Sequence, residues 1–98
     1  MVGLRFEWDE RKSKTNQRKH GVSFREAESV FTDRFALLLD DEPHSTDEDR
    51  FVLVGLSAAL RTLVVSHCYR QRQDVIRIIS ARRATRGEQD QYNRRWIK

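Results

Sequence analysis

Three arginines in the C-terminal third of the chain have the types and spacing of an anion-binding site. Arg77 lies between two isoleucines in an apolar run, where a guanidinium needs an internal carboxylate or a bound anion as its partner. Arg82 and Arg83 follow where this run meets an expected helix, so exposed helix N–H groups would lie close by. Because the planar guanidinium matches the geometry of phosphate, these residues predict a phosphate site.

A second set of donors lies near the N-terminus, on an expected helix that has no apolar stripe. Lys12, Asn16, Lys19 and His20 share one helical face by their spacing. Either this face lines a phosphate site, or Asn16 caps a neighbouring loop while the lysines lie over apolar surface. His20 ends the expected helix, where the helix dipole favours its cation, as suits a general acid.

The remaining polar candidates are Glu88, Tyr92 and His67. Glu88 and Tyr92 are four residues apart on one face of the expected last helix, and Tyr92 could equally be a core residue whose hydroxyl is hydrogen-bonded. His67 continues an apolar row of its strand, which is more typical of a structural histidine. The sequence has no glycine-rich phosphate loop and no zinc-ligand spacing, so we expect chemistry without a metal or cofactor.

The elements that would position these residues can be read from caps and hydrophobic spacing. Asp9 and Gly21 bound the first helix, and a second helix begins at Ser23, with Glu26 completing its capping pattern. Its apolar face, Phe24, Ala27, Val30 and Phe31, would lie on a sheet. Strands are expected at 4–8, 35–39, 51–56, 62–69 and 75–80, a loop at 40–50, and a last helix, opened by Thr85, at 85–95. The order β-α-α-β-β-β-β-α predicts an α+β fold with helices packed on a mostly antiparallel sheet.

Length and charge narrow the class of protein. With 98 residues the chain forms one domain, and Cys68, its single cysteine, excludes an internal disulfide. Three basic and nine acidic residues give 21–50 a net charge of −6, whereas nine basic and three acidic residues give 70–98 a net charge of +6. This segregation favours phosphate binding over a solvated surface of mixed charge. With no signal peptide or membrane span in the sequence, a cytoplasmic location is expected.

Two blocks of residues resemble the BrnT toxins of bacterial type II toxin–antitoxin systems, and the resemblance covers nearly the whole chain. The first block is Phe6-Glu7-Trp8-Asp9 with Lys12, Asn16 and Lys19-His20-Gly21-Val22-x-Phe24; the second is Arg77-Ile78-Ile79-Ser80-Ala81-Arg82 with Ala84-Thr85, Glu88 and Tyr92. The chain departs from its relatives at Gly87, where they often carry a basic residue, and in a first helix without alanines.

The resemblance implies a small RelE-like fold, RNA cleavage that arrests translation, and a BrnA-type ribbon-helix-helix antitoxin that binds operator DNA. The leading hypothesis is a metal-independent endoribonuclease with Arg77 and Arg82 as the cations and His20 as the acid–base group. Glu88 and Tyr92 are weaker catalytic candidates. The expected RNA contacts are Lys12, Asn16, Lys19 and Arg83. The alternative is a non-catalytic nucleic-acid-binding or scaffolding module.

Overall fold

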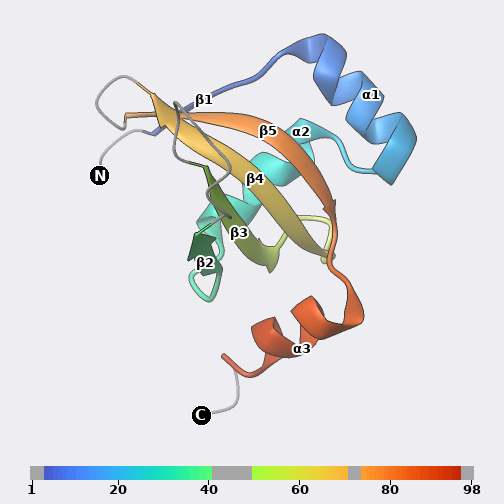
Figure 1. Ribbon diagram of the computed structural model, residues 1–98, viewed down its shortest axis with the longest axis vertical. Coiled ribbons are helices and arrows are strands. Elements are labelled where there is room, and N and C mark those ends of the chain that lie inside the picture. Colours follow the sequence, from blue (N-terminus) through green and yellow to red (C-terminus); the bar gives the residue numbers. More distant parts are fainter. Residues whose placement is uncertain (1–3, 41–49, 71–73, 96–98) are drawn as a thin grey trace.

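The computed structural model describes residues 4–40, 50–70 and 74–95. The elements in these ranges, shown in Figure 1, are β1 (Arg5–Glu7), α1 (Glu10–His20), α2 (Phe24–Ser29), the 3-10 turn η1 (Val30–Thr32), β2 (Leu37–Asp40), β3 (Phe51–Leu56), β4 (Thr62–Arg70), β5 (Val75–Arg83) and α3 (Arg86–Asn93). None of the helices in these ranges is both long and apolar enough to cross a membrane.

The five strands form one mixed sheet in the order β1-β5-β4-β3-β2. Neighbouring strands are antiparallel except β1, which pairs with the first residues of β5 in parallel. The expected α+β class with a mostly antiparallel sheet is therefore confirmed. The observed order contains one element that was not expected, the 3-10 turn that continues α2.

The largest departures from the expected strand boundaries are in β5 and β2, while β1 differs from expectation by one residue at each end and β4 by one residue at one end. β5 runs to Arg83, three residues beyond the expected end at Ser80, because it stays paired with β4 throughout. β2 begins at Leu37 because Asp33 holds the preceding residues in a turn through backbone and side-chain hydrogen bonds. Of the loop expected at 40–50, Asp40 belongs to β2, and residues 41–49 lie outside the described residues.

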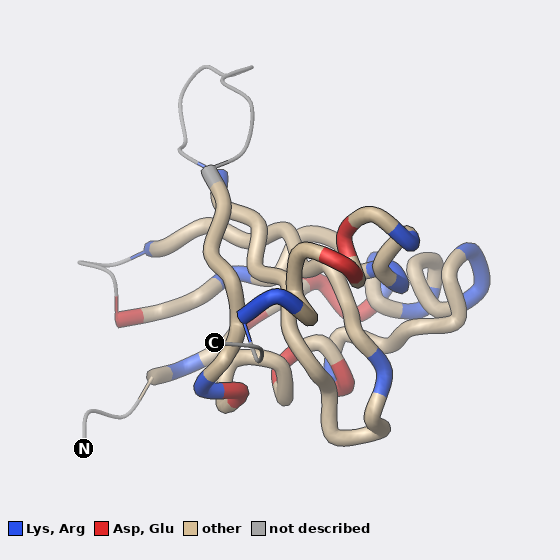
Figure 2. Tube along the Cα trace, turned by 90° about the horizontal axis from the view of Figure 1, so that it is seen from below, with Lys and Arg blue, Asp and Glu red and all other residues tan. Residues whose placement is uncertain are grey.

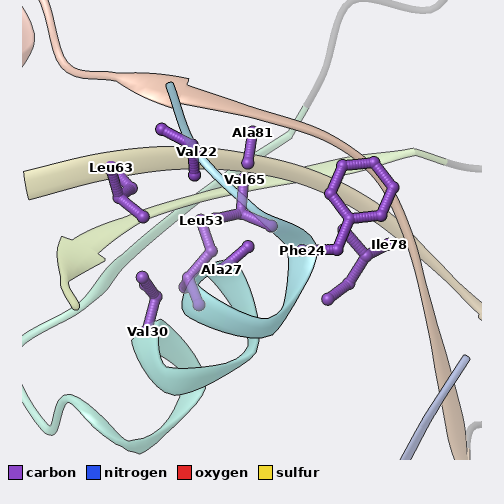
Figure 3. Packing of buried hydrophobic residues seen from close by; sticks show 9 residues of the cluster. All are labelled: Val22, Phe24, Ala27, Val30, Leu53, Leu63, Val65, Ile78 and Ala81. Carbon is purple, nitrogen blue, oxygen red and sulfur yellow. The ribbon is translucent and has the colours of Figure 1, made fainter. Parts of the chain in front are cut away.

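The main core lies between the sheet and the elements that cover one of its faces. Residues of α2, η1 and the loop before them pack against side chains that alternate along β3, β4 and β5, as Figure 3 shows. The expected apolar face of the second helix is confirmed at Phe24, Ala27 and Val30, while Phe31 is only partly buried. The buried cluster consists of Val22, Phe24, Ala27, Val30, Leu53, Leu63, Val65, Ile78 and Ala81.

Among the described residues, α3 covers one end of the opposite face of the sheet. There Tyr92 of α3 packs on Val54 and Val64, with partly buried residues of β2 and β3 around it. In Figure 1, α3 lies below the sheet beyond the end of β5, and no helix of the described ranges covers the middle of this face. Among the described helices, α2 therefore packs on one face of the sheet and α3 on one end of the other.

α1 attaches to the sheet through polar groups instead of leucines. Its buried residues are Ser13 and Asn16. The Asn16 amide donates to the carbonyls of Val22 and Ala81, both at 2.8 Å, and its oxygen accepts the Ala81 N–H at 3.2 Å. The Ser13 hydroxyl accepts the Phe24 N–H at 3.1 Å. Asn16 thus satisfies backbone groups of β5 that β1 is too short to pair, which explains a helix without an apolar stripe.

The capping signals of the sequence are confirmed, with one change of partner. Gly21 ends α1 with a φ of 71°, and the Ser23 hydroxyl accepts the Glu26 N–H. The Glu26 carboxylate, however, does not return to the Ser23 backbone. It accepts hydrogen bonds from the Arg61 guanidinium and from the Ser57 hydroxyl, and these bonds, Arg61 first, lower its pKa despite partial burial. The pair fixes α2 to the turn between β3 and β4.

Candidate functional site

A β-bulge in β5 places Arg77 and Arg82 on the same face of the sheet. In a regular strand, side chains an odd number of positions apart project to opposite faces, so these two arginines would diverge. The register of β5 on β4 shifts between Ile78 and Ser80, and Ile79 is the extra residue. The bulge therefore brings Arg77, Ser80 and Arg82 to the face opposite α2, while α1 lies along the edge of β5, and bulges often re-aim side chains next to functional sites.

We call this surface the open face. Its polar side chains, assigned from the strand register and alternation, include Arg5, Glu7, Ser66, Arg70, Arg77, Ser80 and Arg82.

The partner of Arg77 is an internal carboxylate. Its guanidinium donates to Glu7 Oε2 at 3.1 Å, across the parallel pairing of β1 and β5. Arg70, at the end of β4, approaches the same oxygen at 3.3 Å. One carboxylate thus faces two guanidiniums, which leaves a net positive charge at this end of the open face. Arg70 and Glu7 were not among the expected site residues, since nothing in the sequence shows that β1 and the end of β4 meet.

Arg82 is held by a two-pronged ion pair with Glu88. Its two terminal nitrogens each donate to a different Glu88 oxygen at 2.8 Å. Glu88 also completes the capping box of α3, where its carboxylate accepts the Thr85 N–H at 2.8 Å. The hydrogen bonds from Arg82 first, and then from the Thr85 backbone, lower the pKa of Glu88 to about 2. The carboxylate is therefore charged near neutral pH and fixes where Arg82 points.

Two serines lie between the arginine clusters. Ser66 and Ser80 are paired across β4 and β5, and both are half-buried. Their hydroxyls, between Arg77 and Arg82 along the sheet, add hydrogen-bonding groups to the open face. The sequence signal for them is that each interrupts a strongly apolar strand.

Tyr92 is a core residue whose hydroxyl is hydrogen-bonded, one of the two expectations for it. The side chain is 2% exposed, and its hydroxyl donates to Asp33 Oδ2 at 2.6 Å. The same oxygen accepts the Leu56 N–H at 2.8 Å. Burial raises the pKa of Asp33, but the hydrogen bonds from Leu56, Tyr92 and Phe35 outweigh it and the net shift is downward. Tyr92 therefore fixes α3 to the turn before β2.

The four donors expected on one face of α1 lie in two different environments. Asn16 is buried, and both of its N–H groups are used by backbone carbonyls, so the loop-capping interpretation holds for it. Lys12, Lys19 and His20 are exposed. The last turn of α1 lies at the end of the sheet where β4 begins, since the Gly21 carbonyl accepts a hydrogen bond from Arg61 at 2.9 Å. Lys19 and His20 are thus near the Arg82 end of β5.

Arg83 lies apart from Arg82 although the two are adjacent in sequence. It pairs with Leu63, whose side chain belongs to the core beneath α2, so Arg83 projects to the helix-covered face. Its charge contributes to the lowered pKa of Glu26 on that side. The anion site expected from Arg77, Arg82 and Arg83 together is therefore divided between two faces.

These arrangements can be compared with known proteins. The family model described as "Ribonuclease toxin, BrnT, of type II toxin-antitoxin system" matches residues 8–88. The chain belongs to the BrnT family. The crystal structure of the Brucella abortus ribonuclease toxin BrnT is similar, with 26% sequence identity and a TM-score of 0.63, over 85% of this chain and 99% of that chain. A comparison with curated proteins gives no match.

The BrnT match includes most of the open face. It covers β5 with its bulge and ends at Glu88, the partner of Arg82, whereas Glu7 and Tyr92 lie outside it. The resemblance stated from the sequence is thus confirmed at the level of the family. Within the described ranges, no three His, Cys, Asp or Glu side chains are grouped so that they could hold a metal ion.

His67 is structural in this BrnT fold. The residue is fully buried, and its ring meets Phe31 and Tyr69 edge-on at centroid distances of 4.9 and 5.4 Å. Nδ1 lies 3.3 Å from the Val65 carbonyl, and Nε2 has no hydrogen-bond partner among the described residues. Burial lowers the pKa of His67, so the neutral ring is favoured in the folded chain.

Proposed function

We propose that this BrnT-family chain is a metal-independent endoribonuclease that cuts RNA on the open face. The observation that carries the proposal is the bulge in β5, which places Arg77 and Arg82 on the same face of the sheet with Ser66 and Ser80 between them. A phosphate that develops extra charge in the transition state needs fixed cations close to it. Carboxylates already hold both guanidiniums in place, so a reacting phosphate would meet oriented donors.

The nucleophile would come from the RNA. The 2′-hydroxyl gives its proton to a base as its oxygen attacks the adjacent phosphorus, and a P–O bond forms. The bond to the 5′ oxygen breaks, and that oxygen takes a proton from an acid. The products are a 2′,3′-cyclic phosphate and a 5′-hydroxyl end. The protein then needs only to orient and neutralise the phosphate and to move protons, the tasks we assign to the two arginines and to His20 at the Arg82 end of the sheet.

Lys12 and Lys19 would contact the RNA backbone beside the site. Along α1, Ser13 contacts the start of α2 and Asn16 contacts β5. At 100° per residue, Lys12 and Lys19 follow Asn16 on the side away from Ser13. This flank of α1 borders β5 and faces away from α2, so a strand leaving the open face at β5 would meet both lysines. Glu88 and Tyr92 act by holding Arg82 and α3.

A substrate with one altered ribose tests this chemistry. We expect the purified chain to cut RNA in EDTA, leaving cyclic phosphate ends, and to bind but not cut at a position where the 5′-side ribose is 2′-deoxy. Undiminished cutting of the deoxy position, or activity lost in EDTA and restored by a divalent ion, would reject the mechanism.

The partners and biological outcome belong to the same proposal. We infer a RelE-like toxin of the cytoplasm that arrests translation by cutting RNA and is neutralised by a BrnA-type ribbon-helix-helix antitoxin. Membership of a type II toxin–antitoxin family supports an antitoxin partner and an RNA substrate. An antitoxin segment that masks the open face would protect β5 from hydrogen exchange in the complex. Protection confined to α2 would contradict masking.

One observation favours the alternative of a non-catalytic nucleic-acid-binding module. Arg77 and Arg82 both have carboxylate partners in this structure, which suits a surface that exchanges a carboxylate for a phosphate without reacting. A binding module of this kind would shift a labelled RNA in a gel and leave it intact. The same assay in EDTA therefore separates the two functions.

A further inference from the structure

The outward surface of α1 carries cations that have no partner within the described chain. Arg11, Lys12, Lys14, Arg18 and Lys19 are all exposed, and none of them forms an ion pair with a described residue. By contrast, Glu26 pairs with Arg61, Glu7 with Arg70 and Arg77, and Glu88 with Arg82. Figure 2 shows basic segments gathered on the turns at the α1 end of the molecule.

Three of these cations form one row on the helix. Arg11, Lys14 and Arg18 have the spacing i, i+3 and i+7, so they lie on one side of α1 and span about 10 Å along its axis. The buried residues Ser13 and Asn16 fix the opposite side of the helix against β5 and α2. The row therefore points directly away from the protein, and we call it the outer row.

The outer row costs folding stability. Like charges three and four residues apart on a helix repel each other, by roughly 0.2–0.5 kcal/mol for each pair. The acidic residues next to α1, Asp9 and Glu10, lie at its N-terminus, where they cap the helix and favour its dipole. A row of like charges that the fold does not neutralise is the expected footprint of a polyanion.

We propose that the outer row is a second RNA-binding surface, which holds a segment of the substrate outside the cleavage site. RNA is favoured over an acidic protein segment because Lys12 and Lys19 continue the positive charge from the outer row to the edge of β5. One phosphate backbone could therefore run from the open face across α1. The inference rests on RNA being the ligand of the proposed function, and it adds a site for longer RNA that the cleavage chemistry does not need.

The test measures how tightly a short and a long RNA bind to wild type and to a variant whose outer row is uncharged. The variant is Arg11→Gln, Lys14→Gln and Arg18→Gln, which keeps helix-forming side chains and removes only charge. The control is Arg25→Gln, Arg34→Gln and Arg94→Gln, which removes the same charge from exposed positions elsewhere. The probes are 2′-O-methyl RNAs of about 6 and about 30 nucleotides, which bracket the sites that such grooves bind.

We expect the outer-row variant to bind the long RNA more weakly and with less dependence on salt. Losing three phosphate contacts lowers the slope of log affinity against log salt concentration by about 2. Wild type should therefore lose roughly twentyfold more affinity than the variant between about 50 and 200 mM salt. The short RNA should bind both proteins alike, and the control variant should keep the wild-type slope. The single change Arg18→Gln should give about a third of the effect, with no loss in melting temperature, because it removes one repulsive pair.

Other outcomes overturn the inference in distinguishable ways. Equal affinity and salt slope for long RNA in wild type and variant overturn the second surface but leave the proposed function intact. Lost affinity for polyglutamate with unchanged RNA binding assigns the outer row to an acidic polypeptide instead. Wild type that binds neither RNA overturns the proposed function together with the inference.

Discussion

The arginines of the open face and the cations of α1 carry the same charge in different settings. Arg77 and Arg82 are half-buried and held by Glu7 and Glu88 at 3.1 and 2.8 Å. The cations of the outer row on α1 are exposed and without an ion-pair partner among the described residues. A guanidinium paired with a carboxylate has a weaker net electrostatic field, but its position is fixed. An exposed, unpaired cation keeps its full electrostatic field, but no partner fixes the position of its side chain.

This difference assigns separate tasks to the two regions. Chemistry at a phosphate needs donors whose directions are set before the substrate arrives, which the carboxylate partners provide. Attraction of a long polyanion needs only charge near the surface, and salt screens that attraction. Changes on the open face should therefore affect the rate of cutting, whereas changes on α1 should affect affinity and its dependence on salt.

Removal of an open-face arginine should have the largest effect of the changes considered, and that effect should be on the cleavage rate. Arg77→Ala or Arg82→Ala should lower the single-turnover cleavage rate at saturating protein at least about a hundredfold, because a fixed cation stabilises the charge that develops on phosphate. Arg25→Ala, an exposed change on α2, is the matched control and should keep the wild-type rate. Circular dichroism and denaturant unfolding establish that each variant is folded.

One result would contradict the assignment of Arg77 and Arg82 to the reaction. Full cleavage activity in folded Arg77→Ala and Arg82→Ala would remove the open face from the reaction. Arg82→Lys refines the test, because lysine keeps the charge but cannot reproduce the two-pronged pairing with Glu88.

The attachment of α1 should be the next most sensitive feature. Asn16→Ala removes three hydrogen bonds and leaves buried backbone groups of Val22 and Ala81 without partners, so we expect a loss of about 2–4 kcal/mol in the free energy of unfolding. Asn93→Ala, at an exposed position of α3, should cost less than about 0.5 kcal/mol. Urea unfolding gives both values, and equal losses in the two variants would contradict the role of Asn16.

The Arg82–Glu88 pair should appear as an acid-dependent part of folding stability. The pKa of Glu88 is about 2 in the fold against an ordinary value of 4.5, so the unfolded chain takes up the proton first as the pH falls. Stability from this pair is present above about pH 4.5 and is lost toward about pH 2. In Glu88→Gln the urea midpoint of unfolding should depend less on pH across this window. The same pH dependence in the variant and in wild type would show that the pair contributes nothing.

His67 should give a smaller effect in a separate range of pH. Burial holds its pKa below the ordinary value of 6.5, so the unfolded chain is protonated first and stability declines as the pH falls below about 6.5. His67→Leu should remove the decline between about pH 6.5 and the range where carboxylates titrate. Urea midpoints measured at intervals of pH would show it, and an identical decline in the variant would assign the effect to other groups.

Local signals in the sequence predicted the elements well, because they act over a few residues. Asp9, Gly21, Ser23 and the Thr85 capping box end or begin helices as expected. The partners of the polar residues were less accessible, since they depend on contacts between distant segments. Glu26 turns to Arg61 instead of its own cap for this reason.

The candidate site shows the same limit more clearly. A spacing of five between Arg77 and Arg82 predicts opposite faces, and only the bulge at Ile79 reverses that outcome. Adjacent Arg82 and Arg83, expected together, are separated because β5 continues three residues beyond its expected end. The length of β5 and its bulge are set by its pairing with β4. This pairing cannot be predicted from the pattern of neighbouring residues in the sequence.

The most direct measurement of the central claim is a side-chain NMR titration with uncleavable RNA. The Nε–Hε signals of arginines are recorded while a 2′-O-methyl RNA, which cannot supply the attacking hydroxyl, is added to the full chain. We predict that the signals of Arg77 and Arg82 shift together and saturate, while Arg61, paired with Glu26 beneath α2, stays unchanged. Shifts confined to Arg61 and Arg25, with Arg77 and Arg82 unmoved, would contradict RNA binding on the open face.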